Sequence, residues 1–314
     1  MTQQRDGMKA PWDVWAASRP SERPHMRVAE TAWPALDMPQ VDETPIDHVT
    51  GDVRLLKGFP SAELGGDRDV WIYLPPGYEQ SETRYPVLYM HDGNNLFDPR
   101  SAFAGQDWGV NETAEWMIRS GLLAPMIIVG PANSCERIAE YTWHPCDSHG
   151  GGQGEAYARF LSDELKPAID ARYRTLPERE STAVMGSSLG GLMSLYLGLH
   201  RPDVFGNVVA MSPSIWWANR RILQDMAAIE PGLRVWIDMG TAEGSSEAES
   251  AQYLEDARAL RDVLQGRGYT LGQDLTCWEV EGASHSEAAW GGRASMALMF
   301  LFGGRREVTD ATAA

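Results

Sequence analysis

The feature that most constrains the fold is an alternation, from about residue 52 onward, of short apolar runs with segments of helical period. Strands that are apolar on both faces and separated by amphipathic helices are typical of a mostly parallel sheet covered on both sides. We therefore expect an α/β fold. The predicted strands are Val53–Lys57, Asp69–Leu74, Pro86–His91, Pro125–Gly130, Thr182–Met185, Val208–Met211, Arg234–Met239 and Leu275–Val280.

Helices are predicted between most of these strands, and a hairpin around Gly65 and Gly66 is expected to join the first two strands. Pro167 should kink the predicted helix around Tyr157–Ile169. The predicted helices lie over Glu112–Ser120, around Tyr157–Ile169, over Leu189–Leu199, through Tyr253–Leu264 and near Glu287–Phe302.

The chain of 314 residues is long enough to bury a full core, and 43% hydrophobic with 23% charged residues is an ordinary globular mixture. Residues 1–50 differ, because prolines recur every few residues around Trp12, Trp15 and Trp33. We expect a partly ordered N-terminal arm over 1–50, one α/β domain over 51–304 and a C-terminal tail over 305–314. A lid, a dimer arm in a homo-oligomer and simple packing stay open as roles for the arm.

Charge and cysteine usage restrict the partners and the compartment. Lys plus Arg is 27 against 44 for Asp plus Glu, so the net charge of −17 disfavours nucleic acid and anionic membranes. No secretory signal precedes the domain and no stretch approaches ~18 apolar residues, so we expect a cytoplasmic protein without a membrane span. Cys135, Cys146 and Cys277 have no metal-type spacing and are expected to be reduced thiols, with a Cys135–Cys146 pair as the alternative in an oxidising compartment.

A candidate nucleophile lies between a predicted strand and a predicted helix. Gly186–Gly190 reads Gly-Ser-Ser-Leu-Gly and fits G-x-S-x-G, whose middle serine is held on a tight turn at the sheet edge. Ser188 is that middle residue, whereas the motif gives its neighbour Ser187 no role. The strand before and the helix after favour a nucleophile elbow over a bland Gly/Ser-rich turn.

A serine hydroxyl needs a base and usually an acid, which in this arrangement follow it in chain order. His285 follows the strand Leu275–Val280 and is the candidate base, because His200 ends the helix that Ser188 begins, ~18 Å away. Glu243 follows the preceding strand and is the candidate acid. Asp238, which lies inside that strand, and a serine–histidine dyad without an acid remain as alternatives.

Acyl transfer also needs hydrogen-bond donors for the oxyanion that develops on the substrate. The backbone N–H of Leu189, next to the serine, should be one donor. The second is expected from the loop after Pro86–His91, with Asn94 preferred over Gly93. His91 and Asp92 precede the serine in the chain, and we expect them to shape that loop.

Three tryptophans are candidates for the walls of a substrate pocket: Trp216 and Trp217, which follow a strand end, and Trp143, which lies in a loop. No cluster of histidines and carboxylates has metal-ligand spacing, and no Gly-rich loop fits a phosphate. We therefore expect neither a metal nor a cofactor.

Several segments form a specific combination: Val87–Gly93, Asn95–Pro99, Ala168–Thr175, Met185–Gly191, Pro202–Gly206, Met211–Trp217, and His285 with Glu287 and Trp290. Together they resemble the putative-esterase family of enterochelin-esterase-like (esterase D-like) α/β-hydrolases. The likeness covers about residues 52–302, and Asn94 departs from it because Gln is expected there.

The resemblance implies an α/β-hydrolase fold and a serine esterase that uses Ser188, His285 and Glu243. Its members include enterochelin esterases, feruloyl and acetyl-xylan esterases, S-formylglutathione hydrolases and mycolyltransferases. We expect hydrolysis of a small neutral ester, such as an acetylated or aromatic-acid sugar ester, through an acyl-enzyme. An acyltransferase and a siderophore esterase are the alternatives, and a non-catalytic binding protein is disfavoured because both the serine and the histidine are present.

Overall fold

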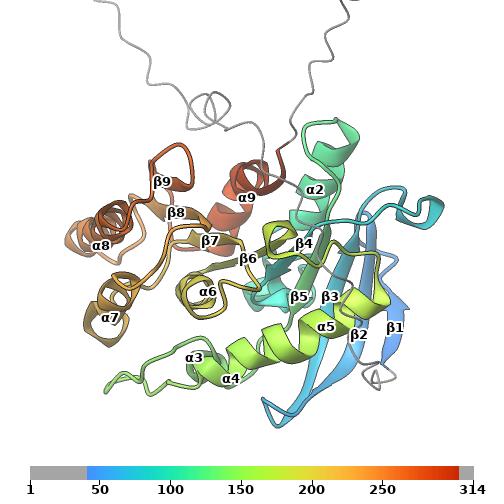
Figure 1. The fold of residues 1–314 in the computed structure, drawn as a ribbon, viewed down its shortest axis with the longest axis horizontal. Helices are drawn as coiled ribbons and strands as arrows, with labels where there is room; N and C mark the ends of the chain where they lie inside the picture. The colour runs from blue at the N-terminus through green and yellow to red at the C-terminus, as the bar shows by residue number, and fades with distance from the viewer. Residues whose placement is uncertain (1–40, 304–314) are drawn as a thin grey trace, which may run out of the picture.

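A twisted sheet runs through residues 41–303, which are the residues that the computed structural model describes (Figure 1). Its nine strands in that part of the chain follow the order β1-β2-β3-β5-β4-β6-β7-β8-β9. The strands are β1 Asp42–Pro45, β2 Asp52–Ser61, β3 Gly66–Leu74, β4 Val87–Met90, β5 Ile127–Pro131, β6 Thr182–Ser187, β7 Asn207–Met211, β8 Arg234–Gly240 and β9 Leu275–Val280.

The sheet has an antiparallel edge and a parallel body. Strands β1, β2, β3 and β5 pair antiparallel in succession, and the hairpin between β2 and β3 was predicted from the sequence. From β5 through β4, β6, β7 and β8 to β9 every pairing is parallel. The prediction of a mostly parallel sheet is confirmed, and the carboxyl ends of six neighbouring strands meet at one edge.

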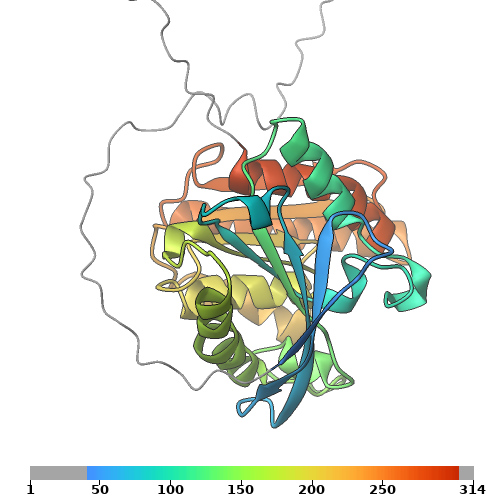
Figure 2. The ribbon, with the colours of Figure 1, turned by 90° about the vertical axis from the view of Figure 1, so that its right-hand side faces the viewer.

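Helices cover both faces of the sheet (Figures 1 and 2). Helices α2 and α9 pack together over one face, whereas α4 to α8 cover the other. The helices are α2 Val110–Arg119, α3 Arg137–Glu140, α4 Gly154–Arg159, α5 Lys166–Arg172, α6 Leu189–His200, α7 Trp217–Met226, α8 Glu247–Gly266 and α9 Glu287–Phe302. Single 3₁₀ turns are η1 Tyr78–Gln80, η2 Gly93–Asn95, η3 Phe103–Gly105 and η5 Arg179–Ser181.

Two helical segments differ from a simple reading of the periodicity. Helices α4 and α5 are joined by a π-helical stretch, η4, over Phe160–Leu165, which ends two residues before Pro167. The predicted kink therefore takes the form of a widened turn, because proline has no N–H to donate to the preceding turn. Helix α7 was not predicted, and its first residues include three with left-handed backbone, Ala218–Arg220.

The end of the predicted arm belongs to the sheet, since β1 pairs with β2. The rest of the arm, with Trp12, Trp15 and Trp33, and the tail over 305–314 lie outside the described residues. Cys135, Cys146 and Cys277 are all free thiols. Within residues 41–303, no helix has both the length and the hydropathy needed to cross a bilayer.

The loop after β4 is fixed by a close backbone approach at Gly93. A Cβ at this position would lie 1.9 Å from the carbonyl oxygen of Gly130 in β5, and backbone cannot move aside cheaply. Gly93→Ala should therefore lower the free energy of unfolding by at least about 2 kcal/mol, measured by urea denaturation. Gly66→Ala is the matched control, because its Cβ would meet nothing within 4 Å, and should change stability by less than about 0.5 kcal/mol. Equal effects of the two variants would contradict this account.

Candidate active site

Ser188 occupies a strained turn between β6 and α6. Its backbone has φ 58° and ψ −122°, a combination that an L-residue adopts at a cost of about 1–3 kcal/mol. The turn is tight enough that a Cβ on Gly186 would lie 2.7 Å from the carbonyl carbon of Gly190. Glycine at these positions lets the chain reverse, and Ser188 lies at the carboxyl end of β6 in front of the first amides of α6.

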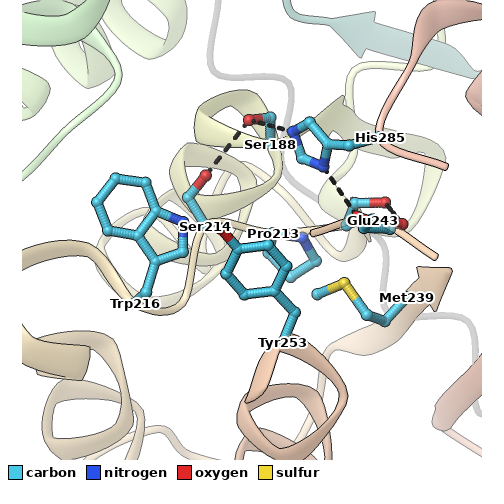
Figure 3. A pocket seen from close by; sticks show the side chains of 9 residues that line it. Ser188, Pro213, Ser214, Trp216, Met239, Glu243, Tyr253 and His285 are labelled. Carbon is cyan, nitrogen blue, oxygen red and sulfur yellow. Dashed lines mark hydrogen bonds and ion pairs between the residues drawn. The ribbon is translucent and has the colours of Figure 1, made fainter. Parts of the chain in front are cut away.

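A continuous chain of hydrogen bonds joins three of the predicted residues (Figure 3). The Nε2 atom of His285 lies 2.9 Å from the Oγ of Ser188, and its Nδ1 lies 2.8 Å from the Oε2 of Glu243. His285 directly precedes the N-cap of α9, Ser286, whose hydroxyl accepts the amide of Ala289 and fixes the start of the helix. The imidazole thus faces the serine with one nitrogen and a carboxylate with the other.

The carboxylate of Glu243 is fully buried and is oriented by donors on its second oxygen. Oε1 accepts hydrogen bonds from the Oγ of Ser212 at 2.5 Å and from the amide of Gly240 at 2.6 Å. Burial alone would raise the pKa of Glu243, but hydrogen bonds from His285, Ser212 and Gly240 outweigh it and hold the pKa below its ordinary value. The side chain is therefore an ionised partner for the imidazole.

Asp238, the rival acid, lies elsewhere. It is fully buried within β8, where its carboxylate accepts hydrogen bonds from Arg293 at 3.0 Å and from the indole N–H of Trp236 at 2.8 Å. The pleat of β8 directs this side chain away from His285 and towards α9. Of the two acids considered, the structure brings Glu243 to the histidine.

The two expected oxyanion donors lie at the beginning of α6 and in η2. Leu189 is the first residue of α6, and the first amides of a helix have no acceptor within it. The side chain of Asn94 is engaged by other residues: its Nδ2 donates to Asn95, and its Oδ1 accepts the backbone amide of Asn133, which follows β5. Any contribution of Asn94 to an oxyanion site would therefore come from its backbone amide.

A pocket of about 140 Å³ opens in front of Ser188. Trp216 lines it, but Trp217 and Trp143 do not, so these two expectations need correction. Trp217 is buried and donates its indole N–H to the carbonyl of His144, and the ring of Trp143 stacks on His200 at 4.1 Å. The lining residues are Ser188, Ser212, Pro213, Ser214, Trp216, Met239, Glu243, Tyr253 and His285.

The pocket contains residues that the sequence reasoning missed. Ser214 places its Oγ 3.3 Å from that of Ser188, and Tyr253 reaches in from α8. Ser212 and Ser214 follow the end of β7, so their position beyond a strand end was a usable signal. Tyr253 was named only as part of the predicted helical segment Tyr253–Leu264.

His91 and Asp92 shape the loop after β4. Nδ1 of His91 lies 3.1 Å from the hydroxyl of Tyr157, and the carboxylate of Asp92 pairs with Arg137 at 2.6 Å. Neither side chain lines the pocket in front of Ser188. Among the residues that the structure describes, no group of three or more His, Cys, Asp or Glu side chains could hold a metal ion.

Comparison with known proteins gives the family. The family model described as "Putative esterase" matches residues 61–301. The chain belongs to this family. It is an esterase, a hydrolase of carboxylic esters with an α/β-hydrolase fold.

Similar proteins include a named esterase, an uncharacterized protein and a solved structure of similar fold. This esterase is 28% identical over 262 residues to the uncharacterized protein YbbA of Bacillus subtilis, covering 80% of this chain and 99% of YbbA. It is 27% identical over 257 residues to the iron(III) enterobactin esterase of Escherichia coli O6:H1, covering 78% of this chain and 57% of that protein. The chain therefore spans little more than half of the enterobactin esterase. The structure of the BES protein from Bacillus cereus has a similar fold, with a TM-score of 0.64 and 21% identity over 84% of this chain and all of that one.

The buried imidazole of His91 should make stability depend on pH. Burial lowers the pKa of His91 to about 4, so the folded protein leaves it neutral where the unfolded chain already binds a proton. Stability from this group is complete above the ordinary value of about 6.5 and is lost as the pH falls towards 4. Phenylalanine cannot titrate. Between pH 7 and pH 4, the free energy of unfolding of His91→Phe should therefore fall by roughly 1–3 kcal/mol less than that of wild type, measured by urea unfolding. Equal decreases in the free energy of unfolding of the two proteins would show that His91 does not contribute to the pH dependence of stability.

Proposed function

We propose that this esterase hydrolyses a small, neutral carboxylic ester through an acyl-enzyme, with Ser188 as nucleophile, His285 as base and Glu243 as acid. The observation that carries the proposal is the unbroken hydrogen-bond chain of 2.9 and 2.8 Å from the serine hydroxyl through the imidazole to a buried carboxylate. This arrangement matches the roles of nucleophile, base and orienting acid in acyl transfer.

The reaction follows from these roles. The Oγ of Ser188 attacks the ester carbonyl carbon while Nε2 of His285 takes its proton, and Glu243 stabilises the resulting imidazolium. The backbone amides of Leu189 and Asn94 hold the oxyanion of the tetrahedral intermediate. His285 then protonates the leaving alcohol as the C–O bond breaks, and water repeats the sequence on the acyl-enzyme.

The lining of the pocket supports a compact, uncharged acyl group. An engineered cavity of about 150 Å³ holds one benzene molecule, so a pocket of about 140 Å³ has room for one ring or a short chain. Pro213, Trp216 and Met239 supply apolar walls, and no lysine or arginine is among the described residues that line it. An acetyl, short aliphatic or single-ring aromatic acyl group fits these walls.

Two other functions would use the same residues. A siderophore ester is favoured by the likeness to iron(III) enterobactin esterase, although the described lining of this pocket offers a multiply anionic ligand no lysine or arginine. Transfer of the acyl group to a sugar or another alcohol instead of water would change only the acceptor. The products formed with and without added alcohol distinguish hydrolysis from transfer.

The nucleophile assignment predicts that Ser188→Ala abolishes ester turnover and leaves the thermal midpoint close to wild type, because the hydroxyl fills little core volume. A fluorophosphonate should label Ser188, identified by peptide mass spectrometry. Ser187→Ala is the control and should keep both turnover and labelling. A label on Ser187, or a folded Ser188→Ala protein with unchanged kcat, contradicts the assignment.

The acid assignment predicts that Glu243→Gln lowers kcat markedly with little change in KM, because the amide keeps the shape but removes the charge that stabilises imidazolium. The loss should be smaller than for Ser188→Ala, since the acid of such a triad can contribute less than the nucleophile. Steady-state kinetics on a p-nitrophenyl ester measures both. Near-wild-type kcat in Glu243→Gln would leave a serine–histidine dyad.

The substrate class is tested by a panel of p-nitrophenyl esters of increasing acyl length, acetylated sugars, feruloyl esters and a siderophore lactone. The pocket predicts that kcat/KM is highest for acyl groups of up to about one ring in size and falls for longer chains. Trp216→Ala should relax this limit. A preference for the siderophore lactone over every neutral ester would overturn the proposed substrate class.

A further inference from the structure

A second layer of buried polar residues lies behind Glu243. The Oγ of Ser212, at the end of β7, accepts hydrogen bonds from the indole N–H of Trp290 at 3.0 Å and from Nη2 of Arg293 at 2.6 Å. Its own proton goes to Oε1 of Glu243. Trp290 and Arg293 both come from α9, which begins two residues after His285.

The direction of these hydrogen bonds is fixed by chemistry. Indole and guanidinium groups can only donate, whereas a hydroxyl has one proton and two acceptor sites. With both acceptor sites of Ser212 filled by Trp290 and Arg293, its single proton must point to Glu243. Together with the amide of Gly240, this proton occupies Oε1 and leaves Oε2 for His285.

Ser212 itself has an unusual backbone. Its φ of 44° lies in the left-handed region, which non-glycine residues enter at a cost of about 1–3 kcal/mol. The strain therefore lies at Ser212, the same residue whose hydroxyl donates to Glu243.

Charge in this layer comes from one guanidinium and two carboxylates. Nη2 of Arg293 lies 2.9 Å from the carboxylate of Asp238 and 3.3 Å from that of Glu243, and all three side chains are almost entirely buried. When both carboxylates are ionised they share one guanidinium, which leaves one net negative charge beside the imidazole. Burial raises the pKa of Asp238, and the charge and hydrogen bond of Arg293 with the hydrogen bond of Trp236 oppose that rise. If Asp238 were neutral, Arg293 would cancel the charge of Glu243.

We propose that Ser212, Arg293 and Asp238 form a positioning relay for Glu243: Ser212 and Arg293 orient its carboxylate, and Asp238 offsets the charge of Arg293 so that Glu243 can stabilise imidazolium. The proposal rests on the proposed function, in which Glu243 is the acid of the triad. None of the three relay residues is proposed to exchange protons with the substrate.

The surroundings of His285 define what a pH experiment reports. Glu243 faces its Nδ1, Ser188 faces its Nε2, and the ring of Trp290 packs edge-to-face at 4.8 Å. Behind them lie Arg293 on α9 and Asp238 on β8. Tyr253 of α8 lines the same pocket, and Glu287 lies in the first turn of α9.

The decisive experiment is a charge cycle read from the pH profile of kcat/KM on a p-nitrophenyl ester. Asp238→Asn removes a negative charge, which disfavours imidazolium, so the acid limb of the profile should move to lower pH by roughly one unit. Arg293→Met removes a positive charge, so the limb should move to higher pH by a similar amount. The double variant carries the same net charge as wild type, and its limb should return close to the wild-type position.

Loss of packing alone would not give opposite shifts that cancel. If Arg293→Met fails to fold because Asp238 is left buried without a cationic partner, the double variant, which removes both charges, still tests the cycle against Asp238→Asn. Shifts in the same direction, or no shift in Asp238→Asn, would overturn the role of Asp238.

Orientation by Ser212 is tested separately. Ser212→Ala should lower kcat about 10- to 100-fold, the value of one hydrogen bond to a charged group, with KM nearly unchanged. Ser212→Gly, which relieves the strained φ, should lose as much activity and thereby exclude strain as the cause. Ser162→Ala is the matched control, since this buried hydroxyl contacts Ala158 and Arg201 instead, and it should keep wild-type kcat.

The outcomes separate the relay from the triad. If Ser188→Ala and Glu243→Gln lose activity while both Ser212 variants keep wild-type kcat, the orienting role is wrong and the triad stands. If Glu243→Gln keeps full activity, the proposed acid itself is wrong, whatever the relay variants do.

Discussion

The strained backbone of Ser188 is the constraint on which the rest of the site depends. A residue between a buried strand and a buried helix keeps φ 58° and ψ −122° only because the packing of its neighbours prevents the backbone from relaxing. Strand β6 lies between β4 and β7 in the parallel part of the sheet, and α6 is buried along most of its length. The same tight packing that creates the strain therefore also fixes the serine hydroxyl at the edge where the neighbouring strands end.

Much of this arrangement could be predicted from the sequence because it depends on local patterns. Apolar runs gave the strands, and the position of Ser188, Glu243 and His285 after three of them indicated a common edge. Pairing of β7 with β6 and β8, and of β8 with β9, then brings those loops together. A parallel sheet converts the order of residues along the chain into proximity at one edge, which is why candidate partners 97 residues apart could be named.

Other parts could not be predicted, because they depend on tertiary packing that no local pattern records. Trp143 lies in a loop and Trp217 follows a strand end beside Trp216, and only the path of each loop separates these two rings from the one in the pocket. Helix α7 begins with left-handed residues that break the helical period. Arg293 read as one charged residue on a largely apolar helix, and its contact with Ser212, 81 residues away, became visible only when α9 was placed against β7 and β8.

The position of α9 near the end of the chain affects when the site is completed during synthesis. This helix carries Trp290 and Arg293, directly follows His285 and closes one face of the sheet together with α2. During synthesis it leaves the ribosome after every strand described here. A growing chain that already holds Ser188 in a folded core would still lack the imidazole and the groups behind Glu243. In the proposed mechanism, ester cleavage would then begin only once α9 has docked, and a partly made chain would still lack an activated serine.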